Sequence, residues 1–180
     1  LIDGVILNEE TVEDLRGKLG IVFQNPDNQF VGITVKDDIA FGLENRNIDR
    51  GEMLARIEKY SKQIGIEHLL NRNPESLSGG EKQKVAIAGI LACEPDVIIF
   101  DEPTNGLDVL TAKAVTDYLQ FLAKNGKTVI ISTHIMSLAQ KLCDRIGIII
   151  NGKMIVCDKL EKVLEKYNST DLEDVFFEMY

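Results

Sequence analysis

Apolar residues recur at helical spacing along parts of the chain and gather into short runs elsewhere. A helical period is typical of amphipathic helices, whereas short runs rich in Val and Ile are typical of strands. The pattern predicts helices over Thr11–Lys18, Arg50–Ile64, Glu81–Cys93, Leu110–Lys124, Ser137–Cys143 and Lys159–Tyr167. It predicts strands over Leu19–Phe23, Val97–Phe100, Thr128–Ser132 and Arg145–Ile150, with an edge strand over Leu1–Leu7.

The alternation of these strands and helices predicts an α/β fold with helices packed on a parallel sheet. Val97–Phe100 is expected to be buried on both faces, as central parallel strands are, and Thr128–Ser132 to be the next buried strand. Arg145–Ile150 is expected as the third strand of this series. Asn151-Gly152 then predicts a hairpin turn into Lys153–Cys157.

A block of helices interrupts this order over about residues 34–90. Thr34 and Asp37 have the spacing of a capping box, which begins a helix. We expect this block to be a helical subdomain inserted into an α/β core that continues over 91–158. Residues 159–180 are expected to form a C-terminal tail.

Composition narrows the class of protein. The chain has 180 residues, of which 44% are hydrophobic and 27% charged, as in ordinary globular domains. No apolar run approaches the roughly 18 residues of a membrane-spanning helix. The net charge of −9 argues against a nucleic-acid partner. The three cysteines lack metal-ligand spacing and indicate free thiols in a reducing compartment such as the cytosol.

Ser78, Gly79, Gly80 and Glu81 form a candidate anion site. Ser78 and Glu81 fit the S-x-x-E pattern of a helix start, and the two glycines allow a ligand close to the backbone. The first N–H groups of a helix carry a partial positive charge that suits phosphate.

Polar residues also follow three of the predicted strands. Asp101 and Glu102 end the strand that begins at Val97, Gln24 ends another, and His134 follows a third. Ligands of open α/β sheets bind at this edge. An Asp beside Mg²⁺, a Glu beside the attacking water and a His that donates to a phosphate would suit phosphoryl transfer.

Together these residues resemble the nucleotide-binding domain of ATP-binding cassette (ABC) ATPases. Gln24 matches the Q-loop, Leu77–Gln83 (LSGGEKQ) the signature, and Val97–Glu102 (VIIFDE) the Walker B strand. Gly106–Asp108 (GLD) matches the D-loop, and Ser132–His134 (STH) the H-loop. The five motifs stand in the family's order, and the resemblance covers nearly the whole chain. Lys84, where many relatives carry Arg, is a mild departure.

The resemblance implies a head-to-tail dimer of two ATPase subunits with ATP and Mg²⁺ at the interface, bound to transmembrane subunits. Ser78, Gly79 and Gly80 would contact the partner's nucleotide. Asp101, through water, and Gln24 would bind Mg²⁺. Glu102 would be the general base and His134 the switch. The resemblance also implies that Asp108 connects the two sites, and that the protein lies on the cytoplasmic face of the cell membrane.

Longer segments of the sequence indicate which group of ABC ATPases the chain resembles. Phe23–Asn45 and Ala86–Gly89 are similar to the ATPases of energy-coupling-factor importers of vitamins or metal ions, and importers are favoured. The segment after His134 is more similar to ATPases of drug or antibiotic exporters, so export is one alternative. A soluble ABC ATPase without a membrane partner is another, and a non-catalytic binding remnant is a third.

The 180 residues contain no P-loop of the form G-x-x-x-x-G-K-[ST], whose backbone N–H groups and Lys hold the phosphates. Gly126-Lys127-Thr128 is no substitute, because Phe121 stands where the first Gly is required and the segment precedes its strand. In relatives the P-loop lies upstream of the part aligned here. The expectation is therefore an N-terminally truncated cassette that by itself binds ATP weakly or not at all.

Overall fold

The structure is a computed structural model that describes residues 4–6 and 8–180. The described residues form two compact units, which divide between Ser132 and Thr133. The edge strand expected over Leu1–Leu7 lies partly outside the described residues. Every longer helix and strand predicted from the apolar pattern is present, and no boundary differs by more than two residues.

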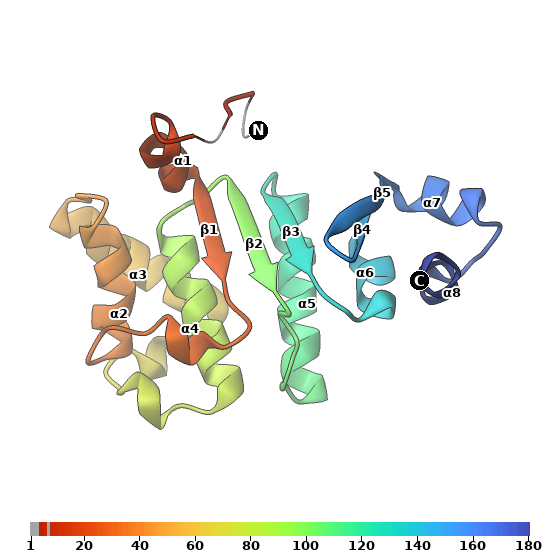
Figure 1. Cartoon of the computed structure of the whole chain (residues 1–180). Coiled ribbons are helices and arrows are strands. Elements are labelled where there is room, and N and C mark those ends of the chain that lie inside the picture. The colour runs from red at the N-terminus through yellow and green to blue at the C-terminus, as the bar shows by residue number, and fades with distance from the viewer. Residues whose placement is uncertain (1–3, 7) are drawn as a thin grey trace. The chain divides into compact units, whose positions relative to one another are not determined.

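The first unit holds a parallel sheet of three strands in the order β1-β2-β3 (Figure 1). These strands are β1 (Leu19–Val22), β2 (Val97–Asp101) and β3 (Thr128–Ser132). Its helices are α1 (Val12–Lys18), α2 (Val35–Glu44), α3 (Arg50–Ile64), α4 (Gly79–Ala92) and α5 (Val109–Lys124). Short 3₁₀ turns lie at Pro26–Asn28, Glu67–Leu69 and Pro74–Ser76.

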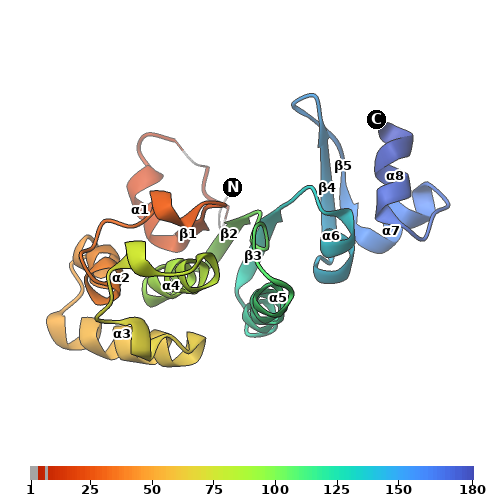
Figure 2. The ribbon, with the colours of Figure 1, turned by 90° about the horizontal axis from the view of Figure 1, so that it is seen from below.

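The sheet is less buried than its sequence predicts. On β2, Ile98 and Phe100 are fully buried, whereas Val97, Ile99 and Asp101 are only partly buried. Figure 2 shows α4 and α5 on the same side of the three strands, so one face of β2 packs against these helices. Among the described strands β3 pairs only with β2, and its Ile130 is 48% exposed, so the expectation of a second buried strand is wrong.

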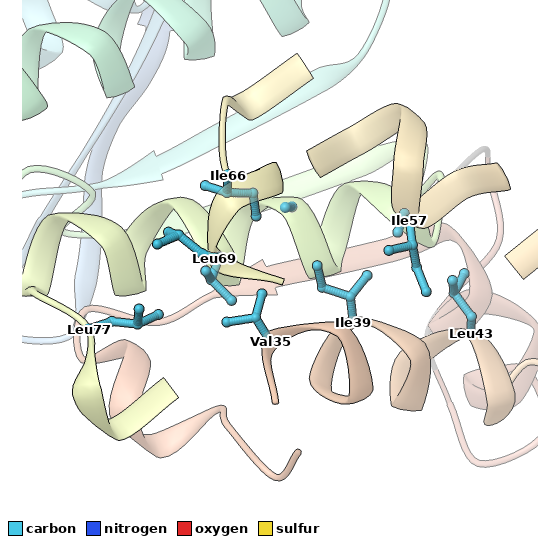
Figure 3. Close-up of a cluster of buried hydrophobic side chains, with 10 residues drawn as sticks. Val35, Ile39, Leu43, Ile57, Ile66, Leu69 and Leu77 are labelled. Atoms are coloured by element: carbon cyan, nitrogen blue, oxygen red, sulfur yellow. The ribbon is translucent and has the colours of Figure 1, made fainter. Parts of the chain in front are cut away.

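A separate core joins the helices α2, α3 and α4. The predicted capping box begins α2: Thr34 accepts the Asp37 N–H, and the Asp37 carboxylate accepts the Thr34 N–H at 3.2 Å. Side chains that are at most 6% exposed then pack between the helices and the turns beside them (Figure 3). They include Val35, Ile39, Leu43, Ile57, Ile66, Leu69 and Leu77. This core holds α4, and with it the turn that begins α4, in a defined position.

The second unit contains β4 (Arg145–Ile150), β5 (Lys153–Lys159), α6 (Met136–Leu142), α7 (Leu160–Lys166) and α8 (Leu172–Met179). β4 pairs antiparallel with β5 in a two-stranded sheet, which corrects the expectation of a third parallel strand. The predicted turn explains the pairing, since Asn151 and Gly152 both have positive φ, 49° and 74°. That conformation is typical of the tight turn that returns a strand alongside itself.

Candidate functional site

The turn Ser78–Gly80, here called the signature turn, begins α4 with a complete capping box. The Ser78 hydroxyl and backbone N–H both donate to Glu81 Oε2 at 2.8 Å, and the Glu81 N–H donates back to Ser78 Oγ at 3.4 Å. The hydrogen bonds from Ser78 lower the pKa of Glu81, and Arg72 at 3.8 Å adds to this. Glu81 is therefore ionised at neutral pH and holds the turn.

The two glycines of the signature turn have different roles. A Cβ added to Gly80 would lie 2.9 Å from Cγ2 of Thr111, so the close approach of α4 and α5 requires glycine there. A Cβ on Gly79 would meet nothing within 4 Å, and its φ is not in the left-handed region. Packing within the described residues thus explains why position 80 is glycine. It gives no steric reason for glycine at position 79, which is exposed.

Asp108 caps α5 beside this turn. Its carboxylate accepts the N–H groups of Leu110 and Thr111 at 3.0 and 3.1 Å and the Thr111 hydroxyl at 2.6 Å. These bonds, led by the one from the hydroxyl, lower the pKa of Asp108. Sequence reasoning gave Asp108 a role between subunits and missed this local one, although a helix-start pattern after Gly106 was readable.

An open pocket of about 330 Å³ brings the signature turn and the segment that ends at Asp108 together. Its lining is Ser78, Gly79, Gly80, Glu81, Lys84, Gly106, Leu107, Asp108 and Thr111. The start of α4 and the cation Lys84 line this pocket, and Gly79 is exposed in it. A helix N-terminus that is open in this way suits a phosphate group. Asp101, Glu102 and Gln24 are not among the lining residues.

The paired carboxylates occupy the carboxyl edge of the parallel sheet. Asp101 is the last residue of β2 and pairs in register with Ser132 at the end of β3. The Glu102 N–H donates to the Ser132 carbonyl at 2.8 Å, which extends the ladder by one residue. Glu102 itself has φ +45°, a left-handed conformation that is costly for a residue with a side chain. Such conformations cluster at functional sites.

Gln24 lies at the same edge, two residues beyond the end of the neighbouring strand β1. Val22 pairs in register with Phe100, so Gln24 and Glu102 each stand two residues beyond a matched pair. Gln29, which sequence reasoning missed, shapes the loop that follows Gln24. Its amide accepts the Phe23 N–H at 2.9 Å and donates to the Ile21 carbonyl at 3.1 Å. No local pattern identifies Gln29, because its contacts are set by the way the loop closes.

His134 is exposed and follows the last residue of β3 by two positions, at the start of the second unit. The sequence-predicted residues therefore fall into three places. Ser78, Gly79, Gly80 and Asp108 line one pocket. Gln24, Asp101 and Glu102 share the sheet edge. His134 is the second residue of the second unit.

The donor set is compatible with Mg²⁺ held mainly by a nucleotide. No group of three or more His, Cys, Asp or Glu side chains gathers as a metal site among residues 4–6 and 8–180. Magnesium in nucleotide sites needs only one or two protein ligands, because waters and phosphates complete its shell. Asp101 at the end of β2, with Gln24 just beyond the end of the adjacent strand β1, meets that requirement.

None of the helices in the described part of the chain combines the length and the apolar character needed to span a membrane.

Comparison with known proteins finds similarity to ATPases of ABC transporters, the family that the site motifs resemble. The profile of the family described as ABC transporter matches residues 1–105. The energy-coupling factor transporter ATP-binding protein EcfA1 of Mycoplasmopsis synoviae is 46% identical over 92% of this chain and 62% of its own length. EcfA1 of Bacillus subtilis is 48% identical over 84% of this chain and 54% of its own length.

Solved structures agree. CbiO1 of Clostridium perfringens, described as part of the ABC transporter complex cbiONQ, superposes with a TM-score of 0.76 at 33% identity. That match covers 96% of this chain and 72% of CbiO1. The chain spans 62% or less of the length of these two EcfA1 relatives. The motifs, the α/β fold and these matches together show that the chain belongs to the ABC transporter family.

Proposed function

We propose that this chain is part of an ATP-hydrolysing subunit that powers an energy-coupling-factor importer of vitamins or metal ions. The observation that carries the proposal is the open signature turn, where a Cβ added to Gly79 would meet nothing within 4 Å and where Asp108 lines the same pocket. A turn that is open in this way can receive a phosphate carried by another subunit. The names of the EcfA1 relatives point to the same kind of transporter.

Each site residue has a place in this proposal. The signature turn contacts ATP held by a partner ATPase subunit, and Asp108 lies where the two subunits meet. Asp101 and Gln24 bind Mg²⁺, and Glu102 is the general base that activates water. His134 contacts the terminal phosphate and acts as the switch. The separation of the pocket from the carboxylates supports a site that two subunits complete.

The relatives support a proposal about the partners of this chain. CbiO1 is described as part of a transporter complex, and we propose a pair of ATPase subunits on transmembrane subunits, at the cytoplasmic face of the membrane. The proposed division of the domain is a helical subdomain over about 34–90, a core over 91–158 and a tail over 159–180. The energy-coupling-factor relative from Mycoplasmopsis synoviae matches 92% of the chain, which favours import over export.

The test is co-purification of the tagged chain with the membrane subunits and the P-loop-bearing ATPase subunit of an energy-coupling-factor transporter. We expect a complex whose association strengthens with MgATP and which hydrolyses it. A Gly79→Glu variant should lose the nucleotide dependence, because its carboxylate would repel the phosphates.

Gly17→Glu is the matched control. Gly17 is also a helical glycine with nothing within 4 Å of an added Cβ, but it lies in α1, away from the signature turn. Equal effects of the two substitutions, or no association with the membrane subunits, would refute the proposed function.

A further inference from the structure

Two segments that sequence analysis treated separately are joined by one ion pair. Lys82 lies in the turn of α4 that follows the signature turn, and Asp27 lies in the 3₁₀ turn Pro26–Asn28 beyond Gln24. Lys82 Nζ and Asp27 Oδ1 are 2.6 Å apart. The pair therefore connects the loop after β1 with the start of α4.

The position of Lys82 is unusual for a lysine. The N-terminal end of a helix carries a partial positive charge that favours acidic residues and disfavours basic ones. The side chain of Lys82 is nevertheless only 16% exposed, whereas that of Asp27 is 55% exposed. A cation placed against the helix dipole and sheltered from water needs a nearby anion, and Asp27 provides it.

A second ion pair in the same unit, between Lys113 and Asp117, is a typical exposed pair within one helix. Lys113 and Asp117 are 2.7 Å apart, one turn from each other on α5, and their side chains are 68% and 58% exposed. Exposed pairs of this kind contribute little to stability and join nothing distant. The Lys82–Asp27 pair has a similar length but joins two different segments.

Asp27 is held firmly on its side of the pair. Its N–H donates to the Asn25 side chain at 3.0 Å, and the Gln29 N–H donates to the Pro26 carbonyl at 2.9 Å. The Gln29 amide in turn is bonded to backbone groups of the strand end. A shift of the loop therefore moves the Asp27 carboxylate with it.

Lys82 is equally fixed to the signature turn. Its N–H donates to the Ser78 carbonyl at 2.9 Å, and the neighbouring Glu81 completes the capping box on Ser78. A force on Lys82 Nζ thus acts on the turn in which Gly79 lies.

We propose that Lys82 and Asp27 are positioning residues that couple the Gln24 loop to the signature turn. Occupation of the sheet edge at Gln24 would shift Asp27, and Asp27 would draw Lys82 and the start of α4 with it. The physical coupling stands on the contacts alone; its role during ATP hydrolysis rests on the proposed function.

Amide hydrogen exchange of the chain tests the coupling directly. Lys82→Met should speed exchange at the Asp27 and Gln29 amides by about two- to fivefold, as loss of one ion pair allows. Asp27→Asn should do the same at the distant Glu81 and Lys82 amides. The double variant Asp27→Lys with Lys82→Asp should restore protection from exchange in both segments. Lys113→Met should leave exchange in both segments unchanged.

The outcomes separate clearly. Reciprocal changes that the charge exchange reverses support the coupling. Exchange rates that change only in the substituted segment would overturn it, as would a double variant that exchanges as fast as the single variants. Faster exchange in the Pro26–Asn28 turn or at the start of α4 in Lys113→Met would also overturn it.

The assembled transporter tests the functional role. There Lys82→Met should lower kcat for MgATP hydrolysis by about two- to thirtyfold, the range expected for coupling residues, and the charge exchange should recover it. If the wild-type complex does not hydrolyse MgATP, the proposed function fails and the exchange result still stands. If it does and Lys82→Met behaves as wild type, only the functional role of the pair fails.

Discussion

Gly79 and Gly80 are adjacent and chemically identical, yet the structure gives them different reasons to be glycine. Gly80 is set against Thr111 of the neighbouring helix, whereas Gly79 has open space where a side chain would be. The sequence shows two equivalent glycines at a helix start, and only the packing of α4 on α5 distinguishes them.

This difference gives a prediction about stability. Gly79→Ala should leave the free energy of unfolding unchanged or raise it by up to about 1 kcal/mol, because alanine is the better helix former. Gly80→Ala should lower it, because the new methyl group meets Thr111 Cγ2 at less than contact distance. Urea denaturation of the chain measures both.

The matched control is Thr111→Ser, which removes Cγ2 and keeps the hydroxyl that donates to Asp108. Combined with Gly80→Ala it should recover most of the lost stability. A larger loss from Gly79→Ala than from Gly80→Ala would contradict this assignment.

Glu102 carries the second prediction at this scale. Its φ of +45° is unfavourable for any residue with a Cβ. Glu102→Gly should therefore be more stable than Glu102→Ala by about 1 kcal/mol. Both variants lose the carboxylate and its contacts, so the difference between their unfolding free energies reports the backbone conformation alone. Equal stabilities would show that the backbone here is not strained.

At the scale of elements, α4 is held at both ends. The start of α4 contacts the Pro26–Asn28 turn through Lys82, and arginines bind carbonyls at its end. Arg56 donates to the Ala92 carbonyl at 3.3 Å, and Arg46 donates to that of Cys93 at 3.0 Å. Glu94, just beyond the helix, accepts from Lys59 Nζ at 2.9 Å and from the Tyr60 hydroxyl at 2.8 Å. The signature turn is therefore the first turn of a helix whose position is fixed by its surroundings.

Glu94 predicts how this anchoring responds to pH. The hydrogen bond from Lys59, with that from Tyr60, lowers the pKa of Glu94 in the folded chain. A carboxyl whose pKa is lower folded than unfolded stabilises the fold above its unfolded pKa of about 4.3, and this contribution is lost as pH falls through the folded pKa.

We therefore expect the midpoint temperature of thermal unfolding to decrease as the pH is lowered below about 4.3. In Glu94→Gln this decrease should be less steep. Glu161→Gln, outside this cluster, is the control. Parallel curves for wild type and Glu94→Gln would exclude this contribution from Glu94.

At the scale of the whole molecule, the 180 residues carry the signature turn, the carboxylate edge and His134 but no P-loop motif. Phosphate binding to one chain depends mainly on the backbone cradle and Lys of that motif. We expect calorimetric titration of the chain with MgATP to give no binding in the micromolar range. Micromolar affinity would show that these residues form a nucleotide site without a P-loop.

What the sequence by itself determined is local. Capping boxes at Thr34 and Ser78, the hairpin turn at Asn151-Gly152 and the five motifs were all readable, because each depends on residues close together along the chain. The tertiary structure alone decided which side of β2 is buried, that β4 and β5 form a sheet separate from β1-β2-β3, and that Lys82 contacts Asp27. Those features depend on contacts between segments that are far apart in the sequence. The local pattern of residues along a single sequence does not specify which segments pack together.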